Sequence, residues 1–114
     1  MQEEILVETL MELYLDTLKK CGMFLVDEDD DIIEYNIFEE FDIGAVSFLH
    51  IDSLIKLRNA GLINDEVLAK SDELRKLFIQ LQNSNQYDII SVRNSKDWRK
   101  LLELSDEIKN MLLS

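Results

Sequence analysis

The chain has 114 residues but no proline and only three glycines. Tight turns depend heavily on these two residues, so their scarcity indicates helices joined by few sharp reversals. We therefore predict a mainly α-helical single domain, a bundle of about four to five helices. An acidic stretch near residue 30 is expected to be irregular, with a possible minor β element beside it.

Helical spacing of apolar residues is clearest in four segments, namely residues 2–21, 44–59, 64–82 and 96–113. Asp42 is a candidate N-cap for the second segment, and Gly61 marks its end. Asn64 is the expected N-cap of the third, with acidic residues in its first turn. Trp98 lies one turn into the last segment and is expected to anchor the core, with an interface aromatic as the alternative.

Three connecting segments give weaker patterns. Residues 23–26 fit a short strand or a buried loop, and residues 86–93 fit a strand or a connector. Residues 32–41 are dense in β-branched and aromatic side chains, which leaves a strand and an irregular loop both open. The run DEDDD at residues 27–31 cannot be buried, so we expect a solvated loop there.

The negative charge of this protein is concentrated in one segment. Residues 21–55 contain ten acidic residues and no lysine or arginine, which is −10 of the chain's net −12. The other residues hold 14 acids and 12 bases, so they are nearly neutral together. This asymmetry predicts a cationic partner and argues against nucleic acid or an anionic membrane as a ligand. The alternative is that the acids only keep the protein soluble.

The first predicted helix adds a second acidic feature. Glu4, Glu8, Glu12 and Asp16 follow one another at four-residue steps, so like charges line one edge of the helix. Each such pair costs about 0.2–0.5 kcal/mol in an isolated helix. Two interpretations follow: a solvated face that a stable core tolerates, or a continuation of the acidic surface.

The acidic run does not fit a calcium-binding loop. An EF-hand that began at Asp27 would place Ile32 where the turn needs glycine and Phe38 where a bidentate glutamate is needed. One that began at Asp29 would place Ile33 at the fifth position, where an oxygen ligand is required. We therefore predict no metal site and no cofactor.

The residues that usually carry catalysis are scarce. His50 is the only histidine and Cys21 the only cysteine, too few for a zinc site, and Cys21 lies on an apolar stripe where a thiol is inert. Adjacent solvated carboxylates lack the unequal environments that acid–base chemistry needs. The sequence also contains no glycine-rich phosphate loop, so we expect a protein that is not an enzyme.

Three sequence features bear on location. The single cysteine excludes an internal disulfide and suits a reducing compartment. The amino terminus lacks the basic region of a secretion signal, and no apolar run approaches the roughly 20 residues that span a bilayer. We expect a cytoplasmic protein.

Three stretches of the chain resemble small bacterial immunity proteins that protect cells from contact-dependent growth inhibition and other polymorphic toxins. They are EEFDIGAVSFLHIDSLIKL at residues 39–57, ELRKLFIQLQNSNQYD at 73–88 and VRNSKDWRKLLELSDEI at 92–108. The resemblance implies a protein that binds a cognate toxin domain tightly and covers its active site. Many such toxins are nucleases with basic clefts, which suits an acidic surface. The resemblance assigns no individual residues, because the interface differs from pair to pair.

Charge alone therefore selects the predicted toxin-binding face within residues 27–42. Its members are nine acids and one aromatic residue: Asp27, Glu28, Asp29, Asp30, Asp31, Glu34, Tyr35, Glu39, Glu40 and Asp42. Isoleucines and the rings of Tyr35, Phe38 and Phe41 are expected to supply apolar anchors among them. The predicted partner is a basic toxin domain, with no direct contact to nucleic acid or membrane. The alternative is an acidic DNA mimic that inhibits a nucleic-acid-binding defence protein, which would need charges spaced like phosphates over a long surface.

Overall fold

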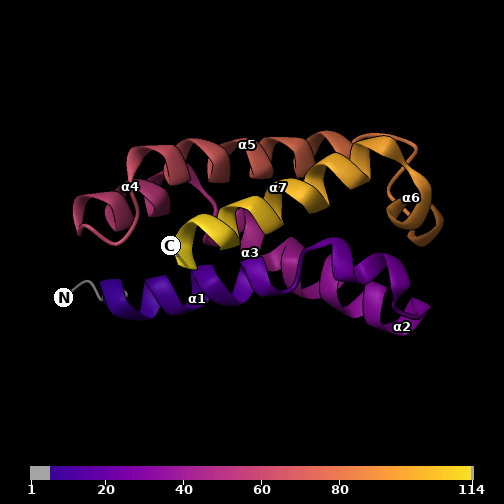
Figure 1. Cartoon of the computed structure of the whole chain (residues 1–114), viewed down its shortest axis with the longest axis horizontal. Coiled ribbons are helices and arrows are strands. Elements are labelled where there is room, and N and C mark those ends of the chain that lie inside the picture. The colour runs from indigo at the N-terminus through magenta and orange to yellow at the C-terminus, as the bar shows by residue number, and fades with distance from the viewer. Residues whose placement is uncertain (1–5, 114) are drawn as a thin grey trace.

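A computed structural model describes residues 6–113 and shows a chain of packed helices (Figure 1). In chain order, the elements are α1 (Val7–Lys19), the 3-10 helix η1 (Met23–Asp27), α2 (Asp30–Ile33), the π-helix η2 (Glu34–Phe41), α3 (Asp42–Ser47), α4 (Ile51–Asn59), α5 (Asp65–Gln82), α6 (Ile89–Asn94) and α7 (Lys96–Leu113). α1 and α5 lie along opposite edges of the view in Figure 1, and α7 crosses between them. The predicted mainly helical class is confirmed. Within residues 6–113 there is no strand, and no helix is long and apolar enough to cross a membrane.

The long helices begin and end close to their local sequence signals. Asn64 Oδ1 accepts a hydrogen bond from the Val67 backbone N–H at 2.8 Å, which caps α5 as predicted. Gly61 follows α4 with a φ of 79°, a left-handed conformation that favours glycine. α7 has the predicted bounds. α1 is shorter than the predicted 2–21 within the described residues, because Leu6 is extended and the helix ends at Lys19. Positions 2–5 of the first predicted helix lie outside the described residues.

The second predicted helix is in fact two helices. Residues 48–50 separate α3 from α4, and the His50 ring nitrogen Nδ1 accepts a hydrogen bond from the Asp52 N–H at 3.2 Å. His50 therefore has a structural role as the cap of α4. The prediction that Asp42 caps a helix is wrong, because its own N–H already donates to the Ile37 carbonyl of the preceding turn.

Every segment whose prediction was open is at least partly helical. Residues 23–26 lie in η1, residues 32–41 lie in α2 and η2, and residues 89–93 lie in α6. The predicted loop at DEDDD is wrong as well. Asp29 caps α2 by accepting a hydrogen bond from the Ile32 N–H at 3.3 Å, and Asp30 and Asp31 form the first turn. The helix dipole favours carboxylates in the first turn of a helix. The acids therefore stabilise α2, although their need for solvent had led to the prediction of a loop.

An aromatic cluster forms the core beside the acidic segment. Trp98 is fully buried, which confirms its role as a core anchor, and its Nε1–H donates to the Gln86 carbonyl at 2.6 Å. The rings of Phe41 and Phe78 meet edge to face with centroids 4.9 Å apart. Burial of each such ring stabilises the fold by roughly 1.5–3 kcal/mol. The cluster joins η2, α5 and α7, so it fixes where the acidic segment lies.

Close contacts hold α1 against the rest of the bundle. Gly44 of α3 packs on Thr17 of α1, where a β-carbon at Gly44 would lie 2.6 Å from Cγ2 of Thr17. The Tyr14 hydroxyl lies 2.7 Å from the Ser71 hydroxyl in a buried hydrogen bond to α5. These contacts leave little freedom in how the acidic segment crosses α1.

Candidate protein-binding surface

Residues 30–47 form one continuous helical run through α2, η2 and α3, here called the acidic helix. Its buried side chains recur every four residues and continue to the next one beyond the run: Ile33, Ile37, Phe41, Ala45 and Leu49. In a pure α-helix, a four-residue step overshoots a full turn by about 40°. The π-helix η2 has wider turns closed by i→i+5 bonds, and it offsets this drift. The π segment therefore keeps the whole row on the core side.

The row opposite the core faces solvent, and we call it the outward row. All five of its members are exposed: Asp31, Tyr35, Glu39, Ile43 and Ser47. Tyr35 is 48% exposed and Ile43 is 63% exposed, which is high for side chains of this size. Carboxylates and apolar side chains alternate along this row from Asp31 to Ile43.

The flank of the acidic helix toward α6 carries Asp30, Glu34, Phe38 and Asp42. The Phe38 ring meets the Tyr87 ring edge to face, with centroids 4.7 Å apart. Asp42 Oδ1 accepts a hydrogen bond from Gln82 Nε2 at 2.7 Å. These two contacts join the flank to the last residue of α5 and to the segment between α5 and α6.

The other flank faces α1 and holds both signs of charge. The Tyr35 hydroxyl donates to Glu40 Oε1 at 2.7 Å, and this hydrogen bond raises the pKa of Tyr35. Lys20 Nζ lies 5.3 Å from the centre of the Tyr35 ring. Asp16 and Glu40 line one hollow together with Lys19 and Lys20. The acidic edge of α1 is therefore separated from the acidic helix by basic side chains, and its member Glu4 lies outside the described residues.

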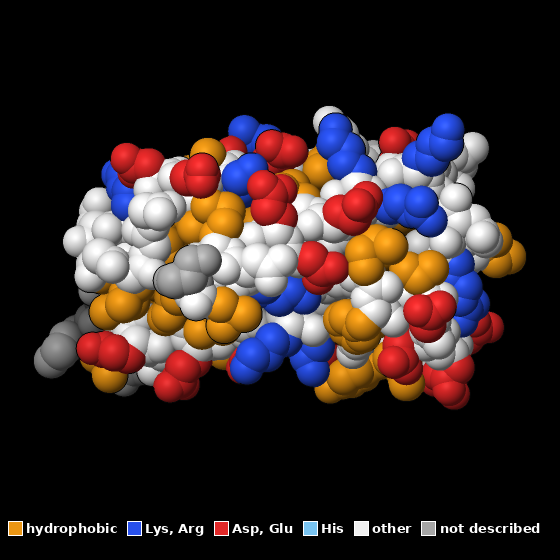
Figure 2. Space-filling model, in the orientation of Figure 1, with side chains coloured by type: hydrophobic (Ala, Val, Ile, Leu, Met, Phe, Trp, Pro, Cys, Tyr) orange, Lys and Arg blue, Asp and Glu red, His pale blue; other side chains and the backbone are white. Residues whose placement is uncertain are grey.

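The ten predicted site residues are distributed over several faces. Asp31, Tyr35 and Glu39 lie on the outward row; Asp30, Glu34 and Asp42 on the α6 flank; Glu40 on the α1 flank; and Asp27, Glu28 and Asp29 precede the acidic helix. Figure 2 shows acidic side chains gathered at the α2 end of the molecule with hydrophobic ones between them. A partner that approaches the outward row would meet three of the ten directly.

Several of these carboxylates are already engaged by the protein itself. Asp29 caps α2, Asp30 pairs with Arg93, Glu40 binds Tyr35, and Asp42 binds Gln82. Within residues 6–113, the remaining five carboxylates make no hydrogen bond or ion pair: Asp27, Glu28, Asp31, Glu34 and Glu39. A binding partner can pair with these five without breaking an internal contact.

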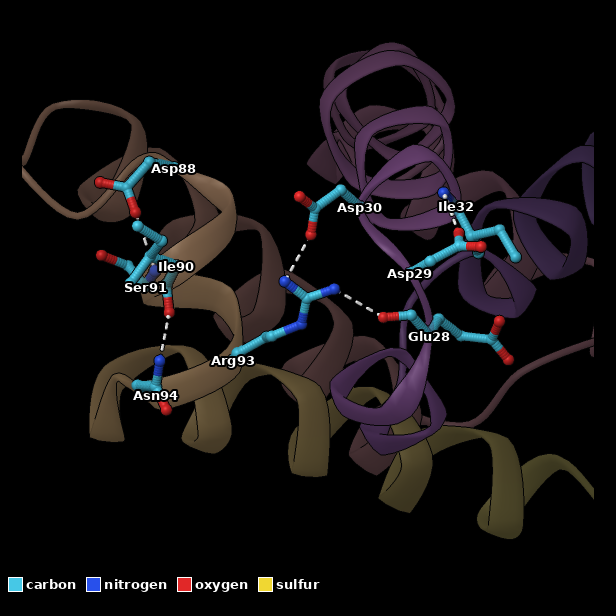
Figure 3. A network of polar contacts seen from close by, with 9 residues as sticks. All are labelled: Glu28, Asp29, Asp30, Ile32, Asp88, Ile90, Ser91, Arg93 and Asn94. Atoms are coloured by element: carbon cyan, nitrogen blue, oxygen red, sulfur yellow. Dashed lines mark hydrogen bonds and ion pairs between the residues drawn. The ribbon is translucent and has the colours of Figure 1, made fainter.

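Arg93 of α6 is a member of this surface that sequence reasoning missed (Figure 3). Its guanidinium donates to Asp30 Oδ1 at 2.5 Å and to the Glu28 carbonyl at 2.7 Å. No local signal points to this pairing, because the residues are 63 positions apart. Arg93 joins α6 to the start of the acidic helix and offsets one of the acidic charges.

The apolar anchors of the surface differ from those predicted. Phe41 is fully buried, so the prediction is wrong for this ring. Phe38 is half-buried: it packs against Tyr87 and also lines a groove beside α6, so its part as an anchor stays a prediction. Tyr35 is exposed as predicted, and Ile43 and Val46 are 63% and 64% exposed. The four-residue repeat could have predicted the exposure of Ile43. Ile43 lies two positions from Phe41 and Ala45 of the buried row, which places it on the opposite side of the helix.

Groups that could carry other chemistry are held in structural positions. Burial raises the pKa of the Cys21 thiol to about 12, so the reactive thiolate is strongly disfavoured. Within the described part of the chain, no three His, Cys, Asp or Glu side chains gather into a group that could hold a metal ion. Comparison with protein families, curated proteins and solved structures finds no match to this chain. The geometry of the acidic helix is what bears on function.

Proposed function

We propose that this protein is a stoichiometric inhibitor that binds a basic protein through the acidic helix, as an immunity protein binds its cognate toxin domain. The proposal depends on one observation: on the outward row, Asp31 and Glu39 alternate with Tyr35 and Ile43 along one exposed line. Carboxylates attract and orient a basic partner, and the apolar side chains supply the burial that charge alone cannot. The resemblance to immunity proteins supports the same class of function.

The mechanism of inhibition would be occlusion. A nuclease cleft is lined with lysine and arginine side chains that bind phosphates. Asp31, Glu34 and Glu39 present carboxylates that make no hydrogen bond or ion pair within residues 6–113. Placed against such a cleft, these carboxylates occupy phosphate positions and exclude the nucleic acid. No catalytic group of the inhibitor is needed.

The geometry favours a protein interface over DNA mimicry. A mimic of DNA needs negative charges repeated at phosphate spacing over a long surface. On the outward row, every second position is Tyr35 or Ile43, so an apolar side chain separates the two acids, Asp31 and Glu39. Exposed apolar positions between charges are typical of interface anchors.

The test is co-expression with the product of the neighbouring gene, which the proposal expects to be a toxin domain. The wild-type chain should restore growth and bind the purified domain, and binding should weaken as salt rises, because charge steers the encounter. A double substitution, Asp31→Asn with Glu39→Gln, should weaken binding about tenfold and flatten the salt dependence. A second, Tyr35→Ala with Ile43→Ser, should weaken binding about 10- to 100-fold with the salt slope unchanged.

Glu73→Gln with Glu103→Gln is the matched control, because it removes the same charge from exposed positions on α5 and α7. It should leave affinity within about twofold of wild type. If the control and the outward-row variants lose the same affinity, the loss is due to the change in net charge and not to the outward row. A chain that neither protects against nor binds the neighbouring domain would overturn the proposal.

A further inference from the structure

A groove lies between the acidic helix and α6, beside the outward row. Its volume is about 650 Å³, and its apolar and acidic lining includes Glu34, Phe38, Tyr87, Asp88, Ile89 and Ile90. The ion-paired residues Asp30 and Arg93 complete the lining. The groove joins segments that are about 50 residues apart in the sequence, so no local pattern could have indicated it.

The charge of the groove is unbalanced. Three carboxylates line it, those of Asp30, Glu34 and Asp88, against the single guanidinium of Arg93. Arg93 pairs with Asp30 at 2.5 Å, which cancels one negative charge. Asp88 uses Oδ1 to accept a hydrogen bond from the Ser91 N–H at 2.7 Å, and Glu34 makes no hydrogen bond or ion pair within residues 6–113. A net charge of −2 therefore remains at the rim.

The rest of the groove is apolar and accessible. Ile90 is 73% exposed, although isoleucine is among the residues most often buried. Phe38 and Tyr87 also line the groove, and both are only partly buried, although their rings pack against each other and Tyr87 stacks on Trp98. Aromatic rings next to carboxylates form a site where a cation gains from both, and a flat cation gains most.

We propose that this groove binds an arginine side chain flanked by an apolar residue. The guanidinium would pair with Glu34 and Asp88 and stack on Tyr87, while the apolar neighbour covers Ile90. Arginine suits the groove better than lysine, because its planar, weakly hydrated head both stacks on rings and bridges two oxygens. The groove proposal rests on the proposed function in one respect: the arginine is taken to belong to the same basic partner.

The protein already holds one guanidinium at this groove. The guanidinium of Arg93 is held at the groove wall by one carboxylate and one backbone carbonyl, those of Asp30 and Glu28 (Figure 3). Charge-assisted hydrogen bonds of this kind are stronger than neutral ones. A second guanidinium would find Glu34 and Asp88 on the two sides of the same groove, with no internal partner to displace from Glu34.

The first test is independent of any natural partner. The ¹⁵N-labelled full chain is titrated with acetyl-Leu-Arg-Leu-amide, and amide shifts are followed by NMR. We expect shifts centred on Glu34, Phe38, Ile89 and Ile90, with a dissociation constant on the order of 1 mM. The citrulline peptide has the same shape without the charge and should not bind measurably, and the lysine peptide should bind about threefold more weakly.

Variants on two rows of the same helix test whether the peptide binds in the groove or to the acidic surface in general. Glu34→Gln and Ile90→Ser remove exposed side chains at the groove and should each weaken the arginine peptide about fivefold. Glu39→Gln removes the same charge from the outward row and should change affinity by less than about twofold. Equal losses for Glu34→Gln and Glu39→Gln, shifts scattered over all acids, or no shifts at 10 mM peptide (about ten times the expected dissociation constant) would each overturn the proposal.

The same variants keep this proposal distinct from the proposed function. If a toxin domain is neutralised and its affinity falls with outward-row substitutions but not with Glu34→Gln or Ile90→Ser, the function stands and the groove is not its arginine site. If the peptide binds as described and no toxin is neutralised, the groove stands and the proposed function fails.

Discussion

Arg93 on α6 and Asp30 at the start of the acidic helix are joined by an ion pair of 2.5 Å across 63 residues of sequence. The same guanidinium also donates to the Glu28 carbonyl. The pair therefore links the first turn of the acidic helix to the short helix α6, and it lies at the wall of the groove between them. Without Arg93, the three carboxylates that line the groove would have no cation among the other lining residues.

Replacement of Arg93 should lower the stability of the fold by a modest amount. Arg93→Met should reduce the free energy of unfolding by about 1 kcal/mol, because the pair is partly screened by solvent but the carbonyl also loses its donor. Denaturant unfolding measures the change. Arg58→Met is the matched control, because Arg58 and Asp65 form a more exposed pair at 3.3 Å, and its loss should be below about 0.5 kcal/mol. Equal losses in the two variants would contradict a linking role for Arg93.

Close packing at Gly44 should make this position intolerant of any side chain. Gly44→Ala places a methyl group against Oγ1 of Thr17, 2.6 Å from its Cγ2 and 2.8 Å from its Cβ, so α3 must move from α1. We expect a loss of about 1–3 kcal/mol in unfolding free energy. Thr17→Ala in the same chain removes the contacts with Oγ1 and Cγ2 and should restore part of the loss, which calorimetric melting would show. A Gly44→Ala variant as stable as wild type would mean that the two helices do not meet this closely.

The buried hydrogen bond between Tyr14 and Ser71 should be visible in a double-mutant cycle. Tyr14→Phe leaves the Ser71 hydroxyl without its partner in the core and should cost about 1–2 kcal/mol. Ser71→Ala should cost a similar amount. The double variant should lose less than the sum, with a coupling of about 1 kcal/mol in chemical unfolding. Strict additivity would show that the two hydroxyls do not interact.

Alkaline pH should destabilise the fold through Cys21 before Tyr14 contributes. Burial raises the pKa of Cys21 from 9.0 to about 12, and it raises the pKa of Tyr14 from 10.0 to about 12. The protonated Cys21 thiol therefore contributes its full stabilisation below pH 9. This contribution is lost as the pH rises toward 12, and the free energy of unfolding then falls by up to about 1.4 kcal/mol per pH unit. Between pH 9 and 10, Cys21→Ala should have a flatter slope of unfolding free energy than wild type, whatever its baseline. Parallel slopes would refute the burial of the thiol.

Much of the fold could be predicted from local sequence signals. The Asn64 cap, the left-handed Gly61 and the bounds of α7 each depend on a few adjacent residues, and the structure confirms them. The structure of the acidic segment could not be predicted from local signals. Its β-branched and aromatic residues favour a strand, whereas its acids favour an exposed loop. Neither preference decides the outcome, since Asp29 caps a helix and Phe41 is buried against Phe78.

The sequence by itself determined that the chain is helical and that its charge is collected in one segment. Proline-free composition, helical spacing and ten acids within 35 residues are properties of the chain alone. The four-residue repeat from Ile33 to Leu49 is also present in the sequence, yet it matches no single regular helix. Only the tertiary structure decided that a π segment accommodates this repeat and which row of side chains faces outward. Which carboxylates stay unpaired depends on Arg93, Gln82 and other distant residues, and such contacts are set by packing across the whole domain.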